Sequence, residues 1–192
     1  KQAGIRVMAF TGKDKEYQAK LDLALDAPLV GRWQNSKTGQ KILVDEGLVE
    51  KFSALIKLFI TEETKDIDKH MRRDTTWFYP WEAVRETLTN ALVHRDWTRS
   101  VDIEVCSYAD RLEVISPGKL QNSMTVDKMI AGQRSPRNTL IVEVMRDYGY
   151  VDSRGMGIRT KVIPLMRKFN SQDPVYEATD DYLKTVLYKK NN

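Results

Sequence analysis

Residues 79–97 read YPWEAVRETLTNALVHRDW, and this segment predicts a helix with one buried side. Pro80 suits the first turn of a helix, because its fixed φ and its missing N–H cost nothing there. Apolar residues then recur at helical spacing, which predicts a stripe that faces a core. The stripe consists of Trp81, Val84, Leu88 and Ala91.

Two polar residues of the same helix are candidates for chemistry. Glu86 and Asn90 are four apart, so their side chains lie on one side of the helix, beside the buried stripe. A carboxylate can orient or deprotonate a water, and an amide oxygen can help to hold a hard cation such as Mg²⁺. Because such pairs are also common on solvated helix flanks, the functional interpretation depends on the segments that follow.

The next segments predict a hairpin that ends in a glycine turn. Residues 101–105 alternate between apolar and polar side chains, the pattern of a half-buried strand, and residues 112–115 read as its partner. The second strand leads into Ser116-Pro117-Gly118, which must turn or break it.

Further along the chain, Gly149 ends one apolar-periodic segment, and residues 154–158, RGMGI, open another. Glycines at a helix start let the backbone approach a ligand closely, and the free N–H groups there favour an anion such as phosphate. A Gly-x-Gly taken alone is more often a plain turn, so the order of the motifs is the stronger signal.

That order resembles the GHKL class of ATP-binding domains, found in gyrase-type topoisomerases, Hsp90 chaperones and histidine kinases. The resemblance is closer to the C-terminal domain of bacterial RecG-related ATP-dependent DNA helicases, a family also described as Schlafen/AlbA-type transcriptional regulators. It covers the chain from roughly residue 4 onward. The segments that carry it are 90–97, 110–118, 134–138 and 154–159.

The resemblance implies roles for individual residues. Glu86 would activate the attacking water, and Asn90 would be the Mg²⁺ ligand that bridges to the phosphates of ATP. Gly155 and Gly157 would form the second glycine box near the triphosphate. Gly118 would lie in the first glycine box, close to the adenine.

One departure from the GHKL pattern concerns adenine recognition. The first glycine box normally carries an Asp that accepts the adenine amino hydrogen, and here Ser116 stands at that position. A hydroxyl can accept the same bond, but more weakly. The resemblance also makes Arg134, Arg137 and Asn138 candidate nucleotide-binding residues. The two arginines could grip a phosphate, or equally tie a lid to the body by salt bridges.

Composition sets further limits. A length of 192 residues suits one domain, 1–192, and a net charge of +4 does not by itself mark a nucleic-acid binder. No apolar run approaches a membrane span of about 20 residues, so no membrane partner is expected. The lone Cys106 is expected to be a packed side chain in a reducing, cytoplasmic protein. The start at Lys1 suggests a fragment, and the resemblance implies a missing upstream AlbA-type domain that contacts nucleic acid.

The remaining patterns complete one fold. Residues 5–10 read as a strand, residues 48–59 as an amphipathic helix, and residues 175–187 as a closing hairpin. The segment 34–40 reads as a polar loop, and Pro164 should kink or shift the last helix. We therefore expect an α+β two-layer sandwich of a mixed, mostly antiparallel sheet with helices on one face, as in GHKL (Bergerat) domains.

Two functions remain open from the sequence. The first is an ATP- and Mg²⁺-binding regulatory domain that could hydrolyse ATP, and the retained Glu86, Asn90, Gly155 and Gly157 favour it. The second is a nucleotide-free module for homo-oligomerisation or partner binding, which the missing acid at Ser116 favours. Helicase activity of this chain is not expected, because no P-loop pattern Gly-x-x-x-x-Gly-Lys-Ser/Thr is present. An open pocket around Asn90 would favour the first function.

Overall fold

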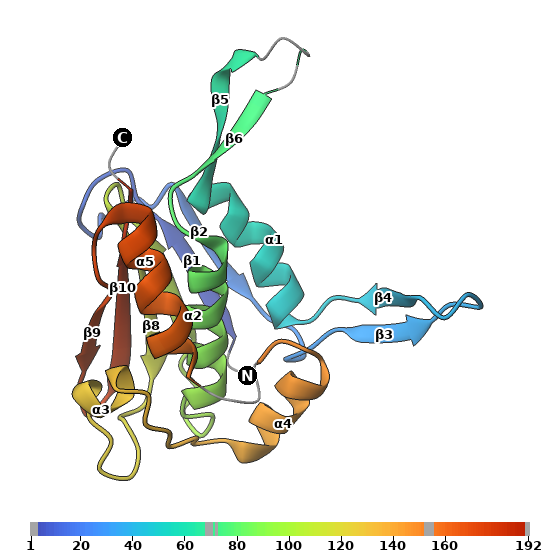
Figure 1. Cartoon of the computed structure of the whole chain (residues 1–192), viewed down its shortest axis with the longest axis vertical. Helices are drawn as coiled ribbons and strands as arrows, with labels where there is room; N and C mark the ends of the chain where they lie inside the picture. The colour runs from blue at the N-terminus through green and yellow to red at the C-terminus, as the bar shows by residue number, and fades with distance from the viewer. Residues whose placement is uncertain (1–3, 68–70, 72, 152–155, 191–192) are drawn as a thin grey trace.

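A six-stranded sheet forms the back layer of the fold in the computed structural model, which describes residues 4–67, 71, 73–151 and 156–190 (Figure 1). The only parallel pair among its strands is β1 with β7, and all other neighbours are antiparallel. The mixed, mostly antiparallel sheet is as predicted. In spatial order the strands are β2 (Leu21–Leu25), β1 (Ile5–Ala9), β7 (Ile103–Ser107), β8 (Arg111–Pro117), β10 (Tyr182–Tyr188) and β9 (Val175–Ala178).

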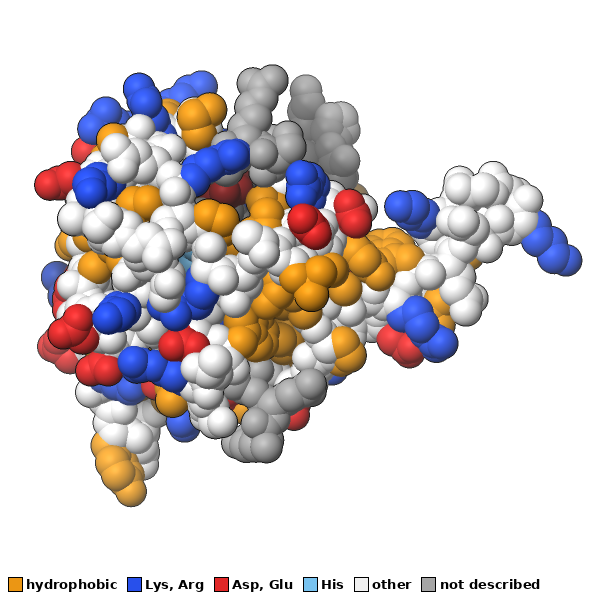
Figure 2. All heavy atoms as spheres, turned by 90° about the horizontal axis from the view of Figure 1, so that it is seen from below, with side chains coloured by type: hydrophobic (Ala, Val, Ile, Leu, Met, Phe, Trp, Pro, Cys, Tyr) orange, Lys and Arg blue, Asp and Glu red, His pale blue; other side chains and the backbone are white. Residues whose placement is uncertain are grey.

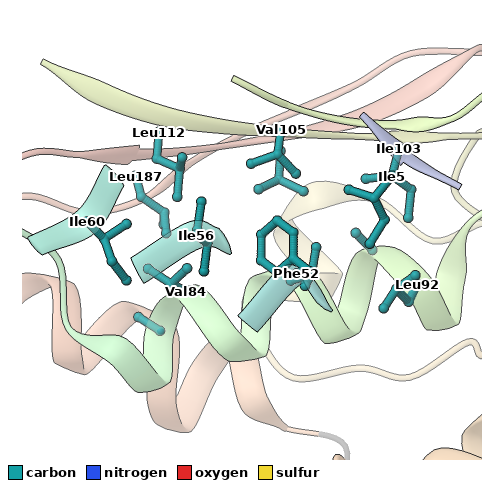
Figure 3. Packing of buried hydrophobic residues seen from close by; sticks show 14 of the residues in the cluster. Ile5, Phe52, Ile56, Ile60, Val84, Leu92, Ile103, Val105, Leu112 and Leu187 are labelled. Atoms are coloured by element: carbon teal, nitrogen blue, oxygen red, sulfur yellow. The ribbon is translucent and has the colours of Figure 1, made fainter. Parts of the chain in front are cut away.

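Helices cover one face of this sheet (Figure 1). They are α1 (Leu48–Ile60), α2 (Trp81–His94) and α5 (Ile163–Asn170). Pro80 is the N-cap residue of α2, and Val84, Leu88 and Ala91 of the expected stripe are buried. The core lies between the two layers, where residues from α1 and α2 meet the inward side chains of the strands (Figure 3). Examples are Phe52, Ile56, Val84, Leu92, Ile5, Val105, Leu112 and Leu187.

The connection from β8 back to α5 carries the other helices. They are α3 (Val126–Ile130), α4 (Thr139–Asp147) and a π-helical segment, η1 (Ile158–Val162), that runs directly into α5. Pro164 occupies the first turn of α5, where its missing N–H is tolerated. The expected shift of the helix boundary at Pro164 therefore takes the form of a change from π to α geometry.

The sequence did not predict strand β2, helix α3 or two hairpins. One consists of β3 (Arg32–Asn35) and β4 (Lys41–Asp45), and the other of β5 (Thr61–Ile67) and β6 (Arg73–Trp77); both project from the body in Figure 1. The expected loop 34–40 is wrong for Gln34 and Asn35, which belong to β3. Both sides of β3 are exposed, so its sequence has no apolar alternation to reveal a strand.

Within the described ranges, no helix combines the length and the apolar character that crossing a bilayer requires.

Cys106 lies on β7 with 1% of its surface exposed, and burial raises the pKa of its thiol to about 11. Because the thiolate is the reactive form, we expect native Cys106 to resist a thiol reagent at pH 8 and to react once the chain is unfolded. Titration with a chromogenic disulfide, with and without denaturant, checks this. Fast reaction of the native chain would contradict the packing.

Candidate functional site

A cavity of about 320 Å³ opens between α2, the end of β8, the start of η1 and the connection that carries α3 and α4. The cavity brings together residues that are distant in sequence and that the sequence analysis predicted to form one site. Those that line it are Glu86, Asn90, Ser116, Gly118, Arg134, Arg137 and Gly157. Of the other two expected site residues, Asn138 does not line the cavity, and Gly155 lies outside the described residues.

The Glu86 carboxylate lies directly against Gly157. Glu86 is only 4% exposed, and a Cβ atom built on Gly157 would lie 1.7 Å from Glu86 Oε1. Asn90 Nδ2 donates a hydrogen bond of 3.4 Å to the same oxygen. The Glu-x-x-x-Asn pair of α2 and Gly157, which was expected in the second glycine box, therefore meet at the N-terminus of η1, where a negative charge is favoured.

Ser116 forms part of the cavity wall at the end of β8. It is 5% exposed, and its hydroxyl donates a hydrogen bond of 3.0 Å to the carbonyl oxygen of Ala91 on α2. With its proton engaged, the Ser116 oxygen keeps only lone pairs for a ligand, so it can accept a hydrogen bond but not donate one.

The backbone conformation at position 118 requires a glycine. Its φ is +108°, and a Cβ atom there would lie 2.7 Å from Cβ of Asp96. The glycine therefore lets β8 turn closely past the chain that leaves α2.

Residues from the last hairpin, which the sequence reading did not assign to the site, form the floor of the cavity. Thr185 on β10 pairs with Val114 on β8 and with Tyr176 on β9, and all three line the cavity. Burial raises the pKa of Tyr176, and the charges of Asp173 and Glu86 raise it further. Alternation along β10 could have shown that Thr185 faces inward, but not that β10 pairs with β8.

Arg137 ties the connection to α2. Its guanidinium donates to the carbonyl oxygen of His94 at 3.2 Å and to that of Lys119 at 2.6 Å, and it pairs with Asp96 at 3.4 Å. This geometry corresponds to the second alternative considered for the arginines, a tie between lid and body.

Asn138 also contacts the C-terminal end of α2. Its amide donates to the carbonyl oxygens of Val93 and Arg95, at 2.7 and 3.0 Å. The last carbonyls of a helix lack intrahelical partners, so the Asn138 side chain satisfies the end of α2.

Basic side chains dominate the charge around the cavity. Glu86 is the one carboxylate among the described residues that line it. His94 also lines the cavity, and the protein packed around its imidazole, together with the Arg137 charge, lowers its pKa, which favours the neutral form. The excess of positive charge favours an anionic ligand. The basic lining residues are Lys119, Arg134, Arg137, Arg146 and Arg159.

A metal held by protein ligands alone does not fit this site. In the part of the chain that the structure describes, no three His, Cys, Asp or Glu side chains gather to hold an ion. Mg²⁺ commonly keeps several waters and binds through one or two protein oxygens plus substrate phosphates. Because Nδ2 of Asn90 faces Glu86, its Oδ1 remains available as such an oxygen. The donor set therefore fits Mg²⁺ only together with a phosphorylated ligand.

Comparison with solved structures supports the fold. The DIP2311 protein of Corynebacterium diphtheriae superposes with a TM-score of 0.73 over 99% of this chain, at 19% sequence identity. The match takes in 35% of the length of that protein, so this chain spans about a third of it. No curated protein matches the chain.

A family comparison finds a match in the second half of the chain. Residues 100–187 match the family described as "Putative ATP-dependent DNA helicase recG C-terminal". The match covers the hairpin β7–β8, the connection with α3 and α4, and the closing strands, whereas Glu86 and Asn90 precede it. Residues 100–187 are therefore similar to the C-terminal domain of RecG-like proteins, in agreement with the resemblance drawn from the motifs.

Proposed function

We propose that this chain is an ATP- and Mg²⁺-binding regulatory domain of a bacterial, RecG-related, DNA-associated protein. The supporting observation is convergence: Glu86, Asn90, Ser116, Gly118 and Gly157 come from separate motifs and line one cavity. Its volume lies at the lower end of the range of small-molecule sites, roughly 300–1,000 Å³. Its basic lining suits phosphates, and the family description supports a nucleotide as the ligand.

Each residue has a defined task in this proposal. The Ser116 oxygen would accept a hydrogen bond from the base, and Gly157 would let the backbone at the start of η1 approach the phosphates. Asn90 Oδ1 would hold Mg²⁺, and the Arg134 guanidinium would contact phosphate oxygens. When bound, ATP supplies the phosphoanhydride bond and Mg²⁺ neutralises its charge.

Hydrolysis is the finer part of the proposal and rests on Glu86. Its carboxylate would accept the proton of an attacking water, with Asn90 Nδ2 keeping it oriented. Because Glu86 is 4% exposed and lies against Gly157, a small shift of η1 would have to admit that water.

A second candidate is a nucleotide-free module for oligomerisation or partner binding. The close contact between Glu86 and Gly157 favours it, because this contact occupies the point where phosphate would meet the glycine box. The use of Arg137 and Asn138 to cap α2 favours it as well. Under either function, contact with nucleic acid is assigned to an upstream domain, and the setting to the cytoplasm.

Calorimetric titration of ATP with Mg²⁺ separates the two candidates. We expect saturable binding to the chain, weakened about tenfold by Asn90→Ala, which corresponds to roughly 1.4 kcal/mol. Asn35→Ala, on the exposed strand β3, is the matched control and should leave the affinity unchanged. No heat at millimolar ATP would reject the nucleotide site and leave the interaction module.

A further inference from the structure

The β3–β4 hairpin, here called the arm (residues 32–45), exposes apolar side chains on a thin projection. Trp33 is 39% exposed, Ile42 54% and Val44 41%. An isolated two-stranded hairpin is at best marginally stable in water, because neither of its faces is covered. Figure 2 shows the arm standing away from the body, with a band of hydrophobic side chains on the body beside its base. We therefore expect a partner surface to cover the exposed apolar side chains of the arm.

Helix α4 presents the second exposed surface. Met145 is its buried residue, whereas Leu140 is 71% exposed and Tyr148, which follows the helix, is 43% exposed. Glu143 and Asp147 are exposed as well. Spacings of three, four and eight residues from Leu140 or Glu143 put these four side chains on one side. We call Leu140, Glu143, Asp147 and Tyr148 the outer face of α4.

The arm and the outer face of α4 carry opposite charges. Lys37 and Lys41 flank the turn of the arm, are exposed, and form no ion pair with any described residue. Glu143 and Asp147 likewise have no ion-pair partner in the described ranges. Each surface therefore combines exposed apolar side chains with two charges of one sign, and the signs are complementary.

We propose that the partner is a second copy of this chain. The arm of one copy lies along the outer face of α4 of the other, and a two-fold axis makes the contact reciprocal. Ile42 and Val44, which lie on one face of the arm because Trp33 pairs with Leu43 and Gln34 with Ile42, then cover Leu140 and Tyr148 of the second copy. The arm lysines face its α4 carboxylates. The proposal does not depend on nucleotide binding.

A single carboxylate holds the two surfaces in a fixed relation within each copy. Glu50 accepts hydrogen bonds from the backbone N–H of Gly31 at 3.3 Å and of Gly47 at 2.9 Å, at the two ends of the arm. The Tyr150 hydroxyl, two residues beyond Tyr148, also donates to Glu50. Because this network orders the base of the arm against the end of α4 before association, less conformational entropy is lost on binding.

Charge argues against nucleic acid as the occupant of the arm. The arm offers only two basic side chains without an ion pair to a described residue, Lys37 and Lys41, because Arg32 is paired with Asp45. Affinity for nucleic acid comes mainly from several Lys and Arg contacts to phosphates. The two lysines of the arm are better matched by the acids of α4.

Sedimentation velocity over a concentration range of about 1 µM to 1 mM, a span that covers moderate and weak affinities, tests the proposal. We expect a reversible dimer. Lys37→Glu with Lys41→Glu should weaken it by about tenfold or more, because like charges then face each other. Glu143→Lys with Asp147→Lys should weaken it similarly, and all four substitutions together should restore it.

Lys20→Glu with Lys168→Glu provides the matched control, since both lysines are exposed and lie away from the arm and α4, Lys20 just before β2 and Lys168 on α5. This variant should dimerise like the original chain. Thermal unfolding of every variant should stay close to that of the original chain, because surface substitutions usually change stability by about 0.5 kcal/mol or less. A chain that is monomeric throughout the range would overturn the proposal, as would a dimer that ignores both charge reversals. Binding of a DNA duplex that Lys37→Glu abolishes in a monomeric chain would assign the arm to nucleic acid instead.

Discussion

Gly157→Ala is expected to destabilise the chain by about 1–3 kcal/mol, the usual effect of overpacking a closed site. The added Cβ would lie 1.7 Å from Oε1, 2.2 Å from Cδ and 2.7 Å from Cγ of Glu86. Glu86 is buried on α2, so its carboxylate cannot swing freely into solvent. Chemical denaturation of the two proteins measures the difference in the free energy of unfolding.

The Glu86→Ala background is the control for this prediction. Removing the carboxylate removes all three atoms in conflict, so Gly157→Ala should cost much less there. Neighbouring residues that share a contact show coupling energies of about 0.5–3 kcal/mol in such cycles. Equal losses in both backgrounds would show that the two residues do not touch, and would remove the main evidence that α2 and the glycine box form one site.

Arg95→Ala is expected to cost about 3 kcal/mol, because it removes the donor from one buried and two partly buried carbonyl groups and empties the space of a fully buried side chain. Arg95 is fully buried and donates to the carbonyl oxygens of Gly4 at 3.4 Å, Arg99 at 3.2 Å and Val101 at 2.5 Å. Its guanidinium also lies 4.5 Å from the ring centroid of Trp97. One side chain thus joins the end of α2 to the entries of β1 and β7.

Thermal unfolding checks the Arg95 prediction. For a chain of this size the melting temperature should fall by roughly 2–4 °C per kcal/mol. Arg99→Ala is the matched control. Arg99 forms ion pairs with Asp96 and Asp181 at the surface, and such pairs contribute about 1 kcal/mol or less. A melting temperature unchanged by Arg95→Ala would show that these carbonyls find other partners.

The regular elements were predicted from local pattern because burial repeats with the period of each structure. The apolar stripe of α2, the alternation of β7 and β8 and the spacing in α1 each record which side faces the core. The arm left no such record, since both of its sides are largely exposed and its apolar residues, Trp33 and residues 42–44, do not alternate with polar ones. Its turn was therefore found, but its strands were not.

The site was predicted in part, for a similar reason. Helical spacing alone placed Glu86 and Asn90 on one side of α2, and the motif order indicated a glycine box beside them. Tyr176 and Thr185 were missed, because their position depends on β10 pairing with β8 across some 70 residues of chain. Pairing between strands so far apart in sequence produces no periodic pattern in the local sequence.

The sequence by itself determined the longer helices, the strands β1, β7, β8, β9 and β10, the α+β class and the helix that bears Glu86 and Asn90, since these depend on side-chain period and backbone preference. It did not reveal strand β2 or the short helix α3. Only the tertiary structure decided that Glu86 lies against Gly157, that Arg137 and Asn138 cap α2, and that Arg95 is buried rather than solvated. The physical reason is that in all three arrangements a side chain contacts the main chain, either by hydrogen bonds to carbonyl groups or by close approach to a glycine. Every residue offers the same carbonyl and N–H groups, so their partners become visible only when the chain has folded.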